Sequence, residues 1–269
     1  MDPRGTGRRL ETSDETMAAQ NAEGIILRKY LLRETSYILV VYTKEFGKIR
    51  GVIKGVRSPY PQFAGDFEIF TRCDLLFYRK QKKPMDLITR CEAIEPFIPA
   101  RKDIERLTYA NYFIELIDVV TDDYDQSAEI YDILVKSLEM LSAGSSPRRT
   151  ARVFEMKLLG ALGLSPQLEE CVACGAEVSG RVDFSVKNGG LLCPKCASGE
   201  SNILKVSPGT LKFLRKVRET DFDRITRVKV SKEVGRETEK MLKWFMLYHV
   251  GRPVKSLKFL AQLQKTGIV

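Results

Sequence analysis

The pattern of hydrophobic and polar positions divides the chain into two parts of different periodicity. From Gly24 to about Pro99, short runs rich in Ile, Val, Leu, Tyr and Thr alternate with Gly, Pro, Asp or Lys clusters, as β-strands do. The five runs are residues 24–33, 37–43, 47–55, 68–79 and 86–96. Five strands with no helical pattern between them predict a small antiparallel barrel, for which the five-stranded OB-fold is the natural candidate.

From about Arg101 the apolar residues recur with the period of a helix. One predicted face comprises Tyr109, Tyr112, Phe113, Leu116, Ile117 and Val120, and a second comprises Tyr131, Leu134, Val135 and Leu138. A long later helix would place Val234, Met241, Leu242, Phe245 and His249 on one face. The second part of the chain is therefore predicted to be mostly α-helical.

Start and stop signals frame these helices. Ser146 and Ser207 are each followed by proline, the residue favoured at the first helical position, and Ser231 can also cap a helix. Gly163 is a stop signal, and a last short helix is expected after Pro253.

The fold class predicted from these patterns is α+β and multidomain. We expect an OB-fold barrel over residues 17–99 and a helical domain over residues 100–269. Residues 1–16 lack periodicity and precede a second methionine, so we interpret them as a disordered or vector-derived leader.

Composition excludes two broad classes of protein. With 43% hydrophobic and 29% charged residues, the chain has the composition of a folded globular protein. Its longest uncharged apolar runs are far shorter than the ~18 residues that a membrane span requires, and the first 16 residues contain no apolar core of a signal peptide. We therefore expect a cytoplasmic protein without a membrane partner.

The net charge of +9 is unevenly distributed. Residues 17–99 carry a net +5 and residues 171–269 a net +10, whereas residues 100–170 between them carry a net −5. Two basic blocks separated by an acidic block suit contact with a polyanion better than uniform solubility charge does. A nucleic acid is the partner that this distribution favours.

The spacing of four cysteines is the most specific signal in the sequence. Cys171 and Cys174 form one C-x2-C pair, and Cys193 and Cys196 form a second pair eighteen residues later, which is the spacing of a tetrahedral zinc site. Residues 182–192 between the pairs read as a β-hairpin that returns the chain to the metal. Disulfides and an iron–sulfur cluster are the competing interpretations. With four protein ligands, one Zn²⁺ would have a structural role.

Three other residues with reactive side chains favour plain packing roles. Cys73 and Cys91 lie within strand patterns among apolar neighbours, which indicates small buried core residues rather than a redox pair. His249 is the only histidine and lies on an apolar helix face near the helix end, where packing is the favoured role. No phosphate-binding loop of the form G-x-x-x-x-G-K-[ST] is present, so ATP hydrolysis is not supported.

An acidic run offers ligands for a two-metal nuclease, which is the rival function. The run straddles a predicted boundary between two helices, where solvated aspartates cap and terminate helices. We therefore favour the capping interpretation for Asp118, Asp122, Asp123 and Asp125.

Basic residues in the third predicted strand form a candidate nucleic-acid surface. Strand alternation places Lys48, Arg50 and Lys54 on the outward face of the barrel, and Arg57 follows in the next loop. A second cluster, Lys80, Lys82 and Lys83, lies in a later loop, and the aromatic residues available to stack bases are Tyr37, Tyr42, Phe46 and Tyr60. OB-folds hold single strands with such cations and aromatics, although a merely solvated basic face would look the same.

These motifs together resemble the RecO family of bacterial recombination mediators and DNA-repair proteins. Residues 23–57 resemble its amino-terminal OB-fold, and the four-cysteine segment with residues 249–263 resembles its zinc-bearing helical domain. The resemblance implies a non-enzymatic protein that binds single- and double-stranded DNA and anneals complementary strands. It also implies association with RecR, and help in loading RecA onto DNA coated by single-stranded DNA-binding protein. Lys48, Arg50, Lys54 and Arg57 match its DNA-binding region.

The resemblance also implies protein partners and a nucleoid-associated location. The acidic C-terminal tail of single-stranded DNA-binding protein is expected on the +10 block, where Arg252 and Lys255 flank apolar helix faces. RecR has no comparable charge signature, and its docking surface is not assigned beyond the barrel. An RNA-binding accessory protein would share all of these electrostatics and stays open as an alternative.

Overall fold

The computed structural model describes residues 18–57, 67–79, 85–225, 228, 230–252 and 254–265, without the side chains of residues 223, 264 and 265. The expected leader, Tyr60, the Lys80–Lys83 cluster and Pro253 lie outside the described residues. Within them no helix is long and apolar enough to cross a membrane.

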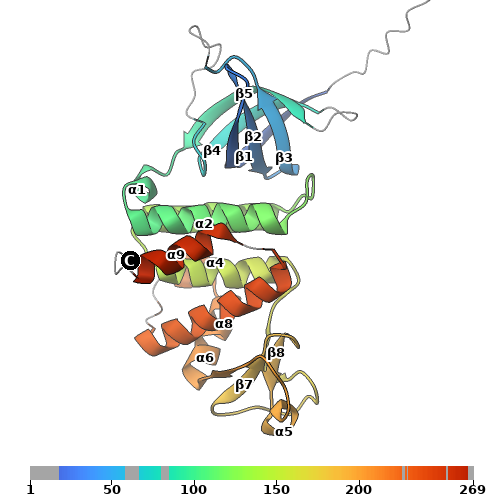
Figure 1. Ribbon diagram of the computed structural model, residues 1–269, viewed down its shortest axis with the longest axis vertical. Helices are drawn as coiled ribbons and strands as arrows, with labels where there is room; N and C mark the ends of the chain where they lie inside the picture. Colours follow the sequence, from blue (N-terminus) through green and yellow to red (C-terminus); the bar gives the residue numbers. More distant parts are fainter. Residues whose placement is uncertain are drawn as a thin grey trace, which may run out of the picture.

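The first part of the chain is a closed five-stranded barrel, as predicted (Figure 1). Its strands are β1 (Ala19–Leu32), β2 (Ser36–Thr43), β3 (Gly47–Ile53), β4 (Arg72–Tyr78) and β5 (Asp86–Glu95). They close in the order β1-β2-β3-β5-β4, with long β1 pairing with both β2 and β4 and with β3 running parallel to β5. This topology is that of an OB-fold.

Side-chain alternation and two glycines explain why these strands close. In β4 the buried residues Cys73, Leu75 and Phe77 alternate with half-buried ones, so one face fills the barrel. Gly24 and Gly51 lie where strands approach most closely, because a Cβ at either position would lie 2.5 Å from Val41 or Ile88.

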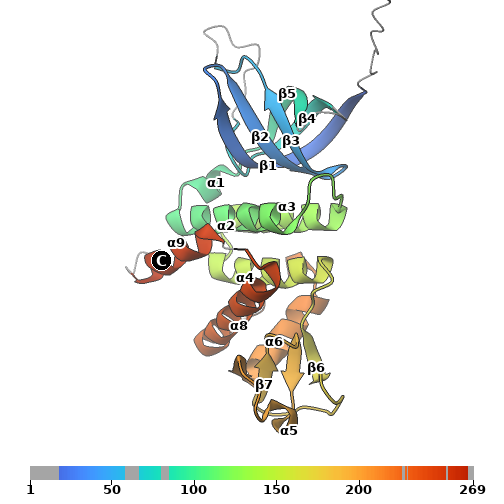
Figure 2. The same ribbon diagram turned by 45° about the vertical axis from the view of Figure 1, so that its right-hand side comes forward.

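The second part of the chain is helical. Its elements are α1 (Ile98–Arg101), α2 (Ile104–Val120), α3 (Ala128–Ser142), α4 (Pro147–Ala161), α6 (Pro208–Glu219), α7 (Phe222–Ile225), α8 (Lys232–Val250) and α9 (Lys255–Lys265). Helices α2 and α3 lie directly under the barrel, α4 and α9 follow, and α8 and α6 lie farther away (Figures 1 and 2).

Two of the three predicted caps form through the serine side chain. The hydroxyls of Ser207 and Ser231 accept from the backbone N–H groups of Thr210 and Val234. Ser146 differs, because its side chain makes no cap hydrogen bond and Pro147 alone marks the start of α4. The predicted helix positions are confirmed, and only the capping chemistry of Ser146 is wrong.

A small sheet with a short helix forms the end of the molecule farthest from the barrel (Figure 2). The strands are β6 (Gln167–Cys171), β7 (Val182–Ser185), β8 (Gly190–Leu192) and β9 (Ile203–Val206), in the order β6-β8-β7-β9, and α5 (Pro194–Ala197) follows β8. Strands β7 and β8 form the predicted antiparallel hairpin. We call residues 167–206 the cysteine module.

Candidate metal centre and nucleic-acid interface

The four predicted ligand cysteines come together in the cysteine module. Cys171 ends β6, Cys174 lies in the following turn, Cys193 is the N-cap residue of α5, and Cys196 lies within α5. Their sulfur atoms all lie within 4.8 Å of one another, and the Sγ atoms of Cys174 and Cys193 are 3.8 Å apart. Four sulfurs arranged tetrahedrally about 2.3 Å from one metal would be separated by roughly 3.8 Å, so the site fits a tetrahedral ion.

Backbone N–H groups around the sulfurs favour thiolates. The Cys193 backbone N–H lowers the pKa of Cys171 to about 6, and the Cys196 backbone N–H lowers the pKa of Cys193. The other pair behaves oppositely: the hydrogen bond with Cys193 raises the pKa of Cys196 to about 12. The cluster therefore deprotonates fully only when a cation balances the accumulating negative charge.

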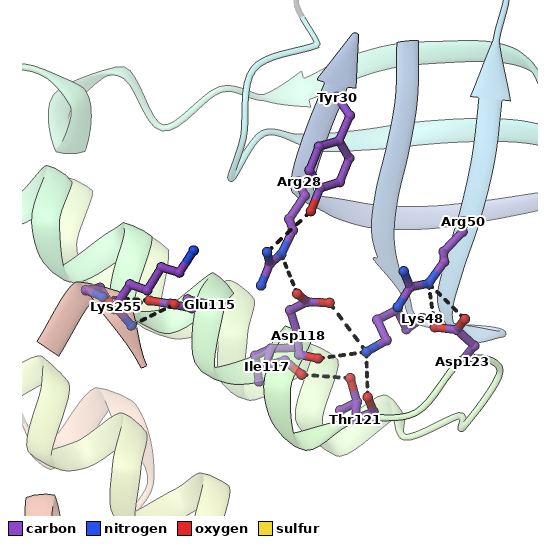
Figure 3. A network of polar contacts seen from close by, with 11 residues as sticks. Arg28, Tyr30, Lys48, Arg50, Glu115, Ile117, Asp118, Thr121, Asp123 and Lys255 are labelled. Atoms are coloured by element: carbon purple, nitrogen blue, oxygen red, sulfur yellow. Dashed lines mark hydrogen bonds and ion pairs between the residues drawn. The ribbon is translucent and has the colours of Figure 1, made fainter. Parts of the chain in front are cut away.

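Lys48 is not on the outer surface as the strand alternation predicted. Its side chain is 4% exposed, and its ammonium donates to the backbone oxygens of Asp118 (2.7 Å) and Thr121 (2.5 Å) while lying 3.4 Å from the Asp118 carboxylate (Figure 3). The predicted exposure is wrong because helix α2 covers this end of β3. Lys48 is a contact between the barrel and the helical domain.

Arg50 is exposed but already paired. Its Nε lies 3.1 Å and 2.8 Å from the two carboxylate oxygens of Asp123, on the loop that follows α2 (Figure 3). The same loop binds β3 through its backbone, because the Tyr124 N–H donates to the Lys48 carbonyl at 2.8 Å. Any phosphate at Arg50 would have to compete with Asp123.

Lys54 and Arg57 are exposed at the other end of β3. The Arg57 backbone N–H donates to the Thr35 carbonyl, which brings the segment after β3 beside the β1–β2 turn and its exposed Arg33. Within the residues that the structure describes, none of these three cations forms an ion pair. We call Arg33, Lys54 and Arg57 the distal basic surface, because this end of the barrel lies away from the helices (Figure 1).

Sequence reasoning missed Arg33, whose position beside β3 follows only from the pairing of β2 with both β1 and β3. In register, Leu32 pairs with Ser36 and Tyr37 pairs with Ile53, so the turn at residues 33–35 lies beside the end of β3. OB-folds bind oligonucleotides through this strand face and through this loop.

The candidate base-stacking aromatics are mostly occupied. Tyr42 is fully buried, so the prediction that it could stack bases is wrong. Phe46 packs edge-to-face on Phe77, and Tyr37 is half-buried and packs against Phe67. Of the described candidates, Tyr37 lies closest to the distal basic surface, since it pairs with Ile53 at the end of β3.

The acidic run is an ion-pairing surface rather than a set of helix caps. Asp118, in the last turn of α2, pairs with Arg28 and Lys48 of the barrel, and Asp123 pairs with Arg50 (Figure 3). Asp118 and Asp123 were predicted to cap helices, with metal binding in a nuclease as the alternative. In the structure both instead form ion pairs between the helical domain and the barrel. Within the described residues, the cysteine quartet is the sole cluster suited to a metal.

The remaining predictions of plain packing are confirmed. Cys73 and Cys91 are buried in the barrel core, where hydrogen bonding between them and burial raise the pKa of Cys73. His249 packs on Phe245, with ring centroids 4.3 Å apart.

A groove runs between the barrel and α9. Its cavity of about 600 Å³ is walled by apolar residues that include Ile104, Ile114 and Phe259, and Lys29 and Lys255 lie at its rim. The carboxylate of Glu115 accepts from the backbone N–H groups of Lys255 and Ser256, which fixes the start of α9 (Figure 3). We call this cavity the α9 groove.

A closed OB-fold barrel, joined to a helical domain that carries a four-cysteine module, defines a multidomain OB-fold protein with a cysteine cluster that could hold a metal ion. Two family models cover nearly the whole chain: "Recombination protein O N terminal" matches residues 17–97, and "Recombination protein O C terminal" matches residues 101–258. The chain belongs to the RecO family of DNA repair proteins.

Curated relatives agree with this assignment over nearly their full length. The DNA repair protein RecO of Syntrophus aciditrophicus is 30% identical over 257 residues, covering 94% of this chain and 99% of that protein. That of Desulforamulus reducens is 32% identical over 253 residues, covering 94% and 98%. A Listeria monocytogenes RecO is 29% identical over 246 residues, covering 91% and 95%. The chain is thus a protein of DNA repair and recombination.

Proposed function

We propose that the protein is a non-enzymatic recombination mediator that binds single- and double-stranded DNA and anneals complementary strands. With RecR, it would help to load RecA onto DNA coated by single-stranded DNA-binding protein. The observation that carries DNA binding is the distal basic surface, three exposed cations that form no ion pair within the described residues. Membership of the RecO family supports the rest.

The DNA contacts proposed on the barrel are Arg50, Lys54 and Arg57, with Arg33 added. Lys48 is left out, because its ammonium is satisfied inside the protein. Arg50 contributes only when phosphate displaces Asp123 from it. The unpaired residues of the distal basic surface are therefore the first to meet a phosphate backbone.

The salt dependence of binding tests this assignment. Each phosphate contact contributes about −0.7 to the slope of log K against log salt on single strands. The double variant Lys54→Ala/Arg57→Ala is expected to make the slope shallower by roughly 1.4, whereas Lys48→Ala should leave it unchanged. An unchanged slope in the double variant would show that Lys54 and Arg57 are solvated and do not contact phosphate.

An annealing assay separates the mediator from its rivals. Labelled complementary strands are incubated with the protein and Mg²⁺, and annealing without cleavage is expected. Cleavage would support the nuclease alternative. The same assay with RNA strands of the same sequence compares DNA with RNA, and a clear preference for RNA would favour an RNA-binding accessory protein.

The ion proposed for the cysteine module is one structural Zn²⁺ held by Cys171, Cys174, Cys193 and Cys196. Four thiolates in tetrahedral array are a donor set that zinc prefers, and they leave no open position for catalysis. Elemental analysis of the folded, reduced protein should find one zinc per chain, and a protein free of metal would contradict this.

The α9 groove is the site that we propose for the acidic tail of single-stranded DNA-binding protein. Its apolar wall can take an apolar chain end while Lys255 meets the acidic residues. Lys29 can contribute only when the peptide displaces Glu68, with which its ammonium is paired. Arg252, the other expected contact, lines a neighbouring polar cavity instead. RecR is proposed to dock on the barrel.

Calorimetry with a tail peptide tests the groove in the full chain. Phe259, 46% exposed, can be replaced by Ala without emptying the core, and Phe259→Ala is expected to weaken binding at least about tenfold. Arg33→Ala, on the distal basic surface, serves as the control. Loss of peptide binding in Arg33→Ala but not in Phe259→Ala would move the tail to the barrel.

A further inference from the structure

Helix α8 presents an exposed row of two basic and then two aromatic residues, which lies outside both the cysteine cluster and the barrel surface. Arg236, Lys240, Trp244 and Tyr248 are spaced four residues apart, so each lies next to the following one on the helix surface, and the row winds through about 120°. All four are exposed, and Trp244 and Tyr248 are 42% and 54% exposed. We call these four residues the α8 row, and it extends over about 18 Å at 1.5 Å per residue.

The aromatic half of the row is available to a ligand. Trp244 and Tyr248 lie on consecutive turns of the helix, and Leu247 beside them is also 41% exposed. The three side chains form a contiguous exposed apolar patch, the kind of surface that marks an interaction site. The Lys240 ammonium lies 5.5 Å from the centre of the Trp244 ring. A cation held against an exposed indole is the pairing that binds a phosphate and a base at neighbouring positions.

The basic half of the row leads into a cationic cavity. Arg236 also lines a cavity of about 360 Å³ between the starts of α4 and α8. Its other basic lining residues are Arg148, Arg149, Arg152 and Lys232, and its one acidic lining residue is Glu239. Arg148 is paired with Glu105 at 3.2 Å and Arg152 with Glu155 at 2.8 Å. The N-termini of both helices add partial positive charge there.

Arg152 is an independent sign that this cavity is built for an anion. Its side chain is only 8% exposed, and although one nitrogen bonds Glu155 at 2.8 Å, Nε and Nη1 have no partner among the described residues. Buried guanidinium nitrogens without partners are costly, and a bound anion or water would remove that cost. Lys232 and Arg236 likewise form no ion pair within the described part of the chain.

We propose that the α8 row and this cavity form a second binding surface for single-stranded nucleic acid, with phosphates in the cavity and bases stacked on Trp244 and Tyr248. This inference rests on the proposed function and adds a site to it. Helix α8 lies on the far side of α2 and α4 from the barrel (Figures 1 and 2), so a strand held there would be separate from one on the distal basic surface. A protein that anneals strands without hydrolysing nucleotide can use two such surfaces to hold two strands.

The position of Trp244 supplies a direct probe, because it is the only tryptophan of the chain. The full-length protein is titrated with a thymine oligonucleotide carrying a terminal label. Tryptophan emission reports on the α8 row, while label anisotropy reports on total binding. We expect quenching of the emission in step with the anisotropy change.

Variants establish whether the contact contributes to affinity. Trp244→Ala is expected to weaken binding of the labelled oligonucleotide about fivefold or more, and Trp244→Phe should retain most of the affinity by preserving a stacking face. Arg236→Ala/Lys240→Ala should make the salt slope shallower by about 1.4. Lys205 is an exposed lysine on β9, and Lys205→Ala is the control for loss of positive charge. It should change neither the affinity for the oligonucleotide nor the salt slope.

The outcomes separate this inference from the proposed function. Oligonucleotide binding that leaves the tryptophan emission and the Trp244→Ala affinity unchanged would overturn the second surface and leave the barrel surface standing. Absence of any binding would overturn the proposed function itself. Emission that responds to an acidic peptide but not to the oligonucleotide would make the α8 row a protein-docking face and overturn the inference.

Discussion

Two lysines on the same strand show how far the environment of a residue decides its role. Lys48 and Lys54 are six positions apart on β3 and its extension, and both read as outward-facing cations. The side chain of Lys48 lies beneath α2, where its ammonium is hydrogen-bonded and paired with Asp118. The side chain of Lys54 is exposed to solvent. Their substitutions should therefore have opposite consequences for folding and for DNA binding.

Lys48→Met is expected to lower the free energy of unfolding by about 3 kcal/mol, because it leaves the half-buried Asp118 with one cation fewer and two carbonyls without a donor. Lys54→Met should change the free energy of unfolding by less than about 0.5 kcal/mol. Urea unfolding of both variants measures this difference. Equal, small effects would mean that the Lys48 contact does not stabilise the junction.

Glu23 links the barrel to α3 and makes stability depend on pH. Its carboxylate accepts from Arg72 Nε at 2.8 Å and from the Tyr131 hydroxyl at 2.7 Å, and the hydrogen bond with Arg72 holds its pKa below the usual 4.5. A lowered folded-state pKa stabilises the protein above pH 4.5, and the contribution is lost as the pH falls through the folded-state value.

Glu23→Gln should therefore cost about 1 kcal/mol of unfolding free energy at neutral pH, and the gap to the unmodified protein should close in acid. Urea unfolding of both proteins across a pH series measures the gap. A gap that stayed constant down the series would show that the charge of Glu23 contributes nothing.

At the scale of elements, the cysteine module is expected to depend on the proposed Zn²⁺. Its own small core consists of Cys171, Leu192, Cys193 and Ala197, so two of four core residues are ligands. The sheet connects to the helices where Phe184 of β7 meets Phe245 of α8 edge-to-face, with centroids 5.7 Å apart. Loss of the proposed metal should consequently weaken the packing of the module on α8.

Cys174→Ser is expected to abolish stoichiometric metal binding and to lower the free energy of unfolding by at least about 2 kcal/mol. Cys91→Ala, in the barrel core, is the matched control and should retain the metal whatever its effect on stability. Elemental analysis together with urea unfolding distinguishes them. A fully metallated Cys174→Ser protein would exclude Cys174 as a ligand.

At the scale of the whole molecule, the acidic block of the chain neutralises the near end of the barrel. Besides the ion pairs of Asp118 and Asp123, Gly47 has a φ of +67° and approaches the Asp125 carbonyl so closely that a Cβ would lie 2.1 Å from it. The acidic loop is thus fitted against β3 at the near end of the barrel. The distal basic surface lies at the other end, where its cations form no ion pair with any residue that the structure describes.

Asp123→Asn should release Arg50 and raise the affinity for single-stranded DNA about two- to fivefold, with a salt slope steeper by up to about 0.7. Asp74→Asn, which breaks a similarly exposed pair with Arg90, is the control and should have little effect. Titrations of both variants with single-stranded DNA across a salt series measure the affinity and the slope. No gain in Asp123→Asn would mean that Arg50 does not meet phosphate.

The sequence by itself determined the elements of this protein. Strand alternation, helical periodicity and the C-x2-C pairs depend on local spacing, so the barrel strands, the helices and the cysteine quartet could all be predicted from it. The net charges of the blocks were equally readable, since they require no contacts.

Tertiary structure alone decided which charges are free. Whether Lys48 or Lys54 faces solvent, whether Asp118 caps a helix or binds the barrel, and whether Arg33 lies beside Arg57 depend on residues distant along the chain. The same holds for the α8 row and the cavity beside it, because Arg148 and Arg236 meet only when α4 packs on α8. Local patterns place a side chain on a face, but the partner that covers that face is chosen by packing.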